Sequence, residues 1–187
     1  MKILILISSL PPAGGAEKVA WDLANKLSLK NKVHILTYGS QKETKQFNNV
    51  KVHFLKKENH ELRYYLTIGK KKIISLVDKI NPDVIHAHMF SVFAYVLRKH
   101  KAKKIITLHN SEYQYYNKSI ISKIKHYILT VRGIKQYDHI TTVSSHMQQY
   151  FLKHFKREIN LIPNGFFTDI FKINNKINRE RKKIVYV

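Results

Sequence analysis

The stretch Lys-Ile-Leu-Ile-Leu-Ile at residues 2–7 decides the fold class, because no polar residue interrupts it after its lysine. An apolar run of this kind is typical of a strand that is covered on both faces, as in a parallel sheet. Gly14 and Gly15 come next. The apolar residues that follow them recur at helical spacing, and they are Val19, Ala20, Leu23, Ala24 and Leu27. A buried strand, a pair of glycines and an amphipathic helix in this order predict an α/β fold.

Strand-like and helical stretches continue to alternate along the chain. Short apolar strands, many of them rich in β-branched residues, are predicted at residues 32–37, 50–55, 83–86, 104–108, 139–143 and 159–162. Helices are predicted at residues 62–80, 90–98 and 119–135, and Ser144 is expected to cap a further helix. This alternation predicts a doubly wound parallel sheet with helices on both faces.

The end of the chain differs in composition from its body. Residues 174–183 are polar and charged, which favours a linker, and residues 183–187 are apolar, which favours a strand. We therefore expect one domain over residues 1–172. Residues 173–187 are expected to hold the linker and the first strand of a second domain that this sequence does not contain.

The composition is strongly basic, with 34 Lys and Arg against 12 Asp and Glu and a net charge of +22. Such a surface attracts anionic lipid, nucleic acid or phosphorylated substrates, although a general drift toward lysine explains the charge equally well. Nucleic-acid binding is not expected, because no motif of that class accompanies Tyr113, Tyr115 and Tyr116. The chain has no cysteine, which excludes disulfides and thiolate metal sites and fits a cytoplasmic location.

Ligands of doubly wound sheets bind beyond the carboxyl ends of the strands, so polar residues at those ends are candidates for a site. Gly14 and Gly15 allow a close approach of the backbone, and the start of the following helix favours a phosphate. A tight turn without a ligand explains them equally well. His86 and His88 are spaced to lie on one side of a strand. Hydrogen bonding in a cleft is expected of them, and a metal is not, because no third ligand is close in the sequence.

Two further strand ends carry polar residues. His109 and Asn110 directly follow the strand at residues 104–108, where a histidine can donate to a sugar hydroxyl or a phosphate. A histidine that is satisfied by backbone groups is the alternative. The Pro-Asn-Gly sequence at residues 163–165 forms a turn, because proline restricts one dihedral angle and Asn-Gly tolerates positive φ.

Taken together and in order, these pieces resemble the retaining GT-B glycosyltransferases of family 4. They are the strand at residues 2–7, Gly-Gly-Ala-Glu-Lys-Val-Ala-Trp-Asp-Leu-Ala at 14–24, Pro-Asp-Val-Ile-His-Ala-His at 82–88, Ile-Thr-Leu-His-Asn at 106–110, Ile-Thr-Thr-Val-Ser at 140–144 and Leu-Ile-Pro-Asn-Gly-Phe at 161–166. The resemblance covers almost the whole chain. It implies a Rossmann-like domain, the N-terminal half of a GT-B fold, with the C-terminal domain missing from this sequence.

The resemblance also implies a role for each candidate residue. Gly14 and Gly15 would approach the donor diphosphate, and His109 would act catalytically at the donor sugar. Residues on the acceptor side would be Glu17, His86, His88 and Asn110. Asn164 and Gly165 would lie near the crossover between the two domains. Asn110 departs from the aspartate that the family often has at this place.

The implied reaction transfers a sugar from a uridine or guanosine diphosphate donor to a lipid-linked or surface-glycan acceptor, such as lipopolysaccharide or capsule, without a metal or other cofactor. The enzyme would work in the cytoplasm, with basic helices resting on the inner face of the membrane. Because the donor domain lies outside this sequence, the chain alone is expected to be inactive. The alternative is an acceptor-binding module without catalysis, or a fragment that pairs with a separate donor-domain chain.

Overall fold

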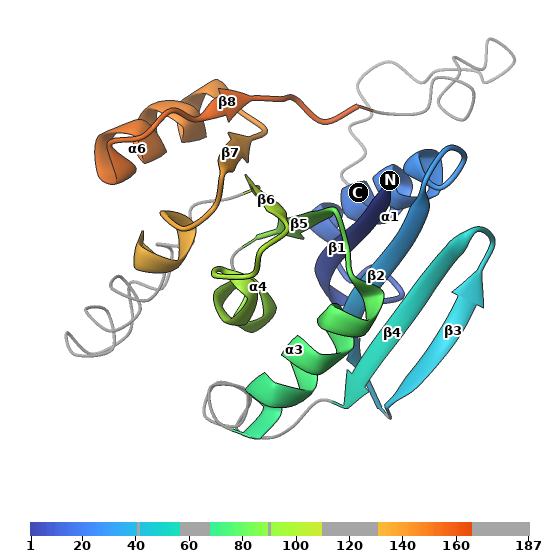
Figure 1. The fold of residues 1–187 in the computed structure, drawn as a ribbon. Helices are drawn as coiled ribbons and strands as arrows, with labels where there is room; N and C mark the ends of the chain where they lie inside the picture. The colour runs from blue at the N-terminus through green and yellow to red at the C-terminus, as the bar shows by residue number, and fades with distance from the viewer. Residues whose placement is uncertain (41, 57–67, 90, 110–130, 166–187) are drawn as a thin grey trace, which may run out of the picture.

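The computed structural model describes residues 1–40, 42–56, 68–89, 91–109 and 131–165 of the chain (Figure 1). Within these ranges the chain forms one sheet of eight strands, in the order β3-β4-β2-β1-β5-β6-β7-β8. The strands are β1 (Lys2–Ser9), β2 (Lys32–Gly39), β3 (Glu43–Phe47), β4 (Val50–Lys56), β5 (Val84–His88), β6 (Lys103–Leu108), β7 (His139–Thr142) and β8 (Asn160–Leu161). The helices are α1 (Gly15–Leu27), α3 (Ile68–Ile80), α4 (Val92–Leu97) and α6 (Ser145–Phe155).

The predicted fold class is confirmed, because helices pack on both faces of a sheet that is parallel apart from its β3–β4 edge. The order of the strands reverses beside β1, which pairs in parallel with β2 on one side and β5 on the other. In doubly wound sheets a crevice opens at the carboxyl ends of the two strands that flank such a reversal. The candidate residues that follow β1 and end β5 therefore lie at this crevice.

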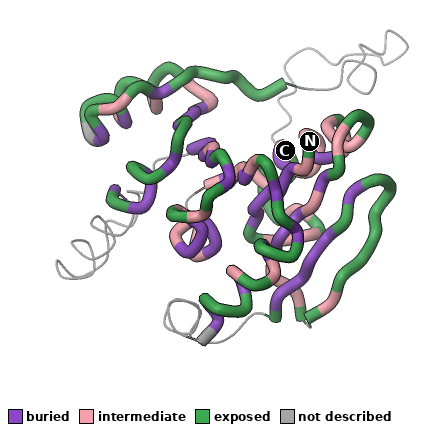
Figure 2. Tube along the Cα trace, in the orientation of Figure 1, coloured by how far each residue is buried: buried purple, intermediate pink, exposed green. Residues whose placement is uncertain are grey.

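Both faces of β1 are buried, which explains its unbroken apolar sequence (Figure 2). Leu4 and Leu6 belong to a core that includes buried side chains of α3, α4 and α6. Ile3, Ile5 and Ile7 belong to a second core on the opposite face. Among the described helices, only α1 contributes buried residues to this second core. The two faces of the sheet are therefore covered unequally by the part of the chain that the structure describes.

The edge strand β3 is absent from the strands that the sequence predicts. Four of its five residues are exposed, because an edge strand has a neighbour on one side only (Figure 2). Its sequence, Glu-Thr-Lys-Gln-Phe, therefore lacks the apolar pattern by which a buried strand is identified. The turn into β4 contains Asn48 at a φ of 51°, a region that asparagine tolerates better than most residues. The adjacent pair Asn48-Asn49 was the signal that could have predicted this hairpin.

Two predicted helix ends agree with the structure, whereas the helix predicted at residues 90–98 is shorter, because α4 covers only Val92–Leu97. Ser144 caps α6, and its Oγ accepts a hydrogen bond of 3.3 Å from the backbone N–H of Met147. Helix α3 ends at Ile80, directly before Asn81, whose φ is 49°. Several predicted segments lie wholly or partly outside the described residues. They are the first residues of the helices predicted at 62–80 and 90–98, most of the helix at 119–135, the linker at 174–183 and the strand at 183–187.

Candidate functional site

The loop after β1 enters α1 through Gly14 and Gly15 and leaves the start of this helix without a side-chain cap. Gly14 is the N-cap residue, with an extended backbone (φ −153°, ψ 176°). An uncapped helix start carries backbone N–H groups and a partial positive charge, and both attract anions. Glu17 lies in the first turn of α1. Its carboxylate oxygen would be 3.1 Å from a Cβ added at Gly14.

The structure gives Gly15 no conformational or packing reason to be glycine. None of the described glycines has a positive φ, and a Cβ added at Gly15 meets no atom within 4 Å. Gly39 is different, because a Cβ there would lie 2.9 Å from the Phe54 ring. A tight turn is therefore not what requires glycine at position 15, and the space beside it is open.

Three histidine rings gather at the carboxyl ends of β5 and β6. His86 and His88 project from the same side of β5, with ring centroids 4.4 Å apart. His109 directly follows β6, which pairs with β5. Its Nε2 lies 3.0 Å from Nδ1 of His88, within hydrogen-bond distance. The spacing of the first two histidines predicted their common side, and the pairing of β5 with β6 brings the third to them.

A row of hydroxyl groups extends the histidine cluster across the sheet. His86 Nε2 lies 2.8 Å from the Thr107 hydroxyl, which lies 2.8 Å from the Thr141 hydroxyl. Thr141 in turn donates to the carbonyl oxygen of Ile106 at 3.3 Å. Thr107 and Thr141 are opposite each other in the register of β6 and β7. Sequence reasoning did not select these threonines, because their connection to His86 depends on strand pairing that a single sequence does not reveal.

The histidines of the cluster are electrically neutral near pH 7. Burial lowers the pKa of His86 to about 4 and that of His88 to about 2, and the neighbouring imidazoles add to both shifts. Burial also lowers the pKa of His109, and the negative charge of Glu17 opposes that shift. The cluster can therefore donate and accept hydrogen bonds without carrying a positive charge.

A cavity of about 880 Å³ lies beside the cluster, between α1 and the face of β5 to β8. Its lining includes residues of the cluster, the hydroxyl row and the loop after β8, among them His86, His88, Thr107, Thr141, Asn164 and Gly165. Apolar side chains such as Val19 and Ile105 form other parts of its wall. The cavity therefore combines hydrogen-bonding groups, including Asp22 and Lys26 of α1, with apolar surface, as ligand pockets commonly do.

Among the described residues, no group of three His, Cys, Asp or Glu side chains is arranged to hold a metal ion. The same part of the chain contains no helix that is both long and apolar enough to cross a membrane.

A family model described as Glycosyltransferase Family 4 matches residues 13–169, which include every strand after β1 and all of the described helices. The chain belongs to glycosyltransferase family 4. Among curated protein sequences, the comparison found no match.

Solved structures show the same fold at low sequence identity. A glycosyltransferase from Rickettsia africae ESF-5 is 20% identical, with a TM-score of 0.62 over 90% of this chain and 44% of that chain. A sucrose-phosphate synthase from Thermosynechococcus elongatus is 12% identical, with a TM-score of 0.62 over 88% of this chain and 90% of that chain. An α,α-trehalose-phosphate synthase (UDP-forming) from Burkholderia vietnamiensis is 14% identical, with a TM-score of 0.53 over 83% of this chain and 42% of that chain. This family 4 chain thus spans less than half the length of the Rickettsia protein.

The structure places most of the predicted site residues of this family 4 chain in two adjoining groups. Glu17 lies in the first turn after the glycines and acts electrostatically on His109, which contacts His88. Asn164 and Gly165 line the cavity together with His86 and His88. Asn110 lies outside the described residues. The roles of all these residues toward a substrate remain predictions.

The buried histidines make the stability of the family 4 chain depend on pH. An unfolded chain binds a proton at His86 near pH 6.5, whereas the folded chain binds it only near pH 4, so acid favours unfolding between these values. We expect His86→Gln, whose amide can still reach Thr107, to weaken this pH dependence. The slope of the free energy of unfolding against pH should change by less than the ~1.4 kcal/mol per pH unit that one full proton contributes. Denaturant unfolding between pH 7 and pH 4 measures it.

The control for this experiment is His146→Gln, at an exposed position on α6. It should leave the slope of the unfolding free energy against pH as in the unchanged chain. An equal slope in the His86→Gln variant and the unchanged chain would contradict the prediction.

Proposed function

We propose that this chain is the N-terminal, acceptor-side domain of a retaining GT-B glycosyltransferase. The whole enzyme would transfer a sugar from a nucleotide-diphosphate donor to a lipid-linked or surface-glycan acceptor in the cytoplasm. One observation carries the proposal: an uncapped, glycine-led helix start and a cluster of neutral histidines meet at the reversal of strand order. Membership of glycosyltransferase family 4 supports it.

The helix start suits the diphosphate of the donor. Gly14 and Gly15 leave the backbone N–H groups of the first turn accessible, and the helix dipole favours negative charge there. Gly15 has open space where any other residue would place a side chain. The name of the Burkholderia relative describes it as UDP-forming, which supports a uridine diphosphate donor for the present chain as well.

The histidine cluster suits the sugars. Neutral imidazoles exchange hydrogen bonds with hydroxyl groups without the desolvation cost of a buried charge. His109 is half-buried at the edge of the crevice and acts as the catalytic residue toward the donor sugar. His86 and His88 lie deeper and line the cavity. We assign them to the acceptor, as we do Glu17 and Asn110. Asn164 and Gly165 mark the crossover toward a second domain.

Transfer from a nucleotide diphosphate needs groups that hold the leaving phosphates and position both substrates. The described residues supply one wall of such a site. We place the remaining donor contacts in a second domain of the enzyme, or in a separate chain that pairs with this one. No metal or other cofactor takes part in the proposed reaction.

Sugar transfer tests the proposed function directly. The protein is purified from its own cells with whatever accompanies it, and is given radiolabelled uridine and guanosine diphosphate sugars with a lipid extract as acceptor. We expect label in the lipid or glycan fraction. The 187-residue chain alone should give none, because it supplies only part of the site.

Two results would contradict this expectation in different ways. Turnover by the 187-residue chain alone would show that no second domain is needed. Neither transfer nor hydrolysis of any donor by the native preparation would remove the proposed function itself.

Gly15→Ala separates a role in binding from a role in folding. The added methyl group meets no atom, and alanine is the better helix former, so the free energy of unfolding should stay level or rise by up to ~1 kcal/mol. Donor affinity of the native preparation should fall about tenfold or more, as for one lost hydrogen bond to a charged group. Calorimetry with the donor and denaturant unfolding provide the two readouts.

The matched control is Gly39→Ala, because its Cβ would lie 2.9 Å from Phe54. This variant should lose stability through overpacking while the crevice is unchanged. Unchanged donor affinity in Gly15→Ala would contradict the role assigned to this glycine.

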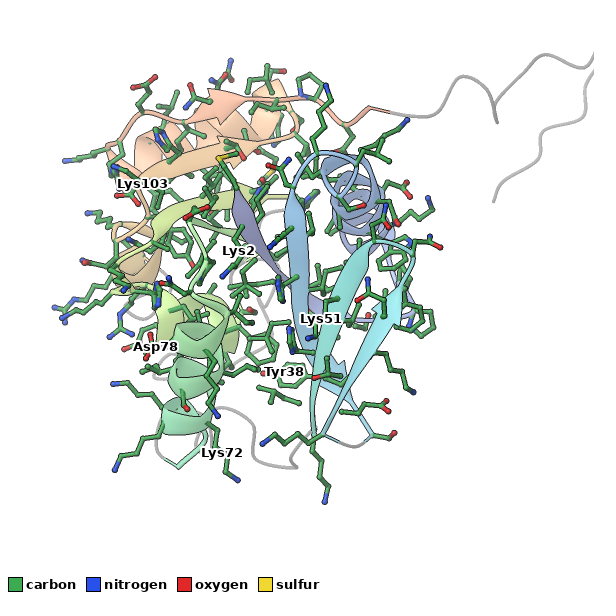
Figure 3. The ribbon with its side chains drawn as sticks, turned by 45° about the vertical axis from the view of Figure 1, so that its right-hand side comes forward. Lys2, Tyr38, Lys51, Lys72, Asp78 and Lys103 are labelled. Carbon is green, nitrogen blue, oxygen red and sulfur yellow. The ribbon has the colours of Figure 1, made fainter. Side chains whose placement is uncertain are left out.

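Three exposed lysines in the first turns of α3 support attachment to the inner face of the cell membrane. Lys70, Lys71 and Lys72 are exposed in the first turns of α3, and Figure 3 shows Lys72 toward the outer end of this helix. Each basic residue near an anionic surface contributes about 1 kcal/mol. Replacing all three lysines by glutamine should therefore weaken binding to phosphatidylserine vesicles about a hundredfold at low salt. Sedimentation with vesicles measures it.

The control variant replaces Lys18, Lys30 and Lys32, three exposed lysines in or near α1, which packs on the opposite face of the sheet. It removes the same charge and should bind vesicles nearly as well as the unchanged chain. Equal losses in the two variants would indicate general charge attraction instead of a membrane-facing surface, and no binding of the unchanged chain would remove the membrane from the proposal.

A further inference from the structure

Beside the contact between His88 and His109 lies one buried polar atom for which the described part of the chain provides no partner. His88 is 4% exposed, and its Nδ1 lies 3.0 Å from Nε2 of His109. The other ring nitrogen of His88, Nε2, is buried and has no hydrogen-bond partner among the described residues. Because a neutral imidazole carries one proton, this asymmetry determines where the protons of the pair are most stable.

Two arrangements of protons allow the hydrogen bond. If Nε2–H of His109 donates, His88 accepts at Nδ1 and must carry its own proton on Nε2. That places a buried N–H group where the described residues offer no acceptor, an arrangement that folded proteins avoid. If Nδ1–H of His88 donates instead, Nε2 of His88 is unprotonated and carries only a lone pair. His109 must then carry its own proton on Nδ1.

We propose that His88 is a positioning residue that holds His109 in the tautomer protonated on Nδ1. His88 donates its Nδ1–H to Nε2 of His109, so the proton of His109 is on the nitrogen that the pair leaves available. His109 then offers a neutral N–H donor to an oxygen of the ligand. This is the less common tautomer of histidine in water, so the protein has to impose it.

His86 and the threonine row support this arrangement from the other side. The three contacts of the row are satisfied together when Thr141 donates to Ile106, Thr107 donates to Thr141, and His86 donates its Nε2–H to Thr107. His86 therefore has a set proton position of its own. Its ring packs 4.4 Å from that of His88, which limits reorientation of His88.

Only one part of the inference rests on the proposed function, namely that His109 donates its Nδ1–H to an oxygen of the ligand. The tautomer itself is measured on the chain without any substrate. The chain is labelled with ¹⁵N-histidine, and the ring nitrogens are observed through their long-range couplings to the ring protons at pH 7. Single histidine variants assign the rings. We expect His88 and His109 both to be protonated on Nδ1.

Two variants of His88 separate positioning from packing. His88→Phe keeps a ring but removes the donor, and it should shift His109 toward the tautomer protonated on Nε2. His88→Asn places an amide N–H near the former Nδ1 and should keep His109 protonated on Nδ1. His146→Gln, at an exposed position on α6, is the control and should leave the tautomer of His109 unchanged. Backbone amide spectra report whether each variant is folded.

The spectrum of the unchanged chain decides first, because His109 protonated on Nε2 would overturn the inference whatever the variants do. An unchanged tautomer in folded His88→Phe would overturn it as well. In the native preparation, His88→Phe should lower kcat with little change in KM, and His88→Asn should restore part of the loss. If no sugar transfer is found but the tautomer is as expected, the proposed function fails and the positioning of His109 by His88 stands.

Discussion

The parallel pairing of β1 with β5 is the constraint on which the candidate site depends. Its register places Ile5 beside His86 and Leu6 beside Ala87. These two strands are distant in sequence, yet their carboxyl ends meet where the order of the sheet reverses. The helix start after β1 and the histidines of β5 therefore face the same crevice. If β1 had a different neighbour, the glycines and the histidines would lie apart and would not face the same crevice.

The histidine cluster is stable because its members remain uncharged. Three imidazoles this close together would repel one another if protonated, and burial makes the charged forms still less favourable. In the neutral state they form hydrogen bonds with each other and with Thr107. The cluster is then a preorganised set of donors and acceptors. Such a set suits hydroxyl-rich ligands, and it agrees with membership of a glycosyltransferase family.

The two faces of the sheet differ, because one forms the larger core and the other carries the candidate binding groups. The face that carries Leu4 and Leu6 packs against three described helices and forms the larger core. On the other face, α1 covers the apolar side chains of β1 and β2 but leaves the polar row of β5 to β7 beside a cavity. The same sheet is thus held together from one side and presents its hydrogen-bonding groups on the other.

Local pattern was sufficient where one segment alone decides the outcome. The unbroken apolar run at residues 2–7 predicted a central strand, Ser144 predicted a helix cap, and the spacing of His86 and His88 predicted their common side, since each depends on the chain's own periodicity or a near neighbour. The exposed strand β3 escaped prediction because an edge does not need apolar residues. Strand pairing joins segments that are distant in the sequence, and a single sequence does not show which strands pair. Only the tertiary structure could therefore show that Thr107 and Thr141 extend the cluster and that a Cβ has room at Gly15. The same holds for the buried nitrogen of His88 that has no partner in the part of the chain that the structure describes.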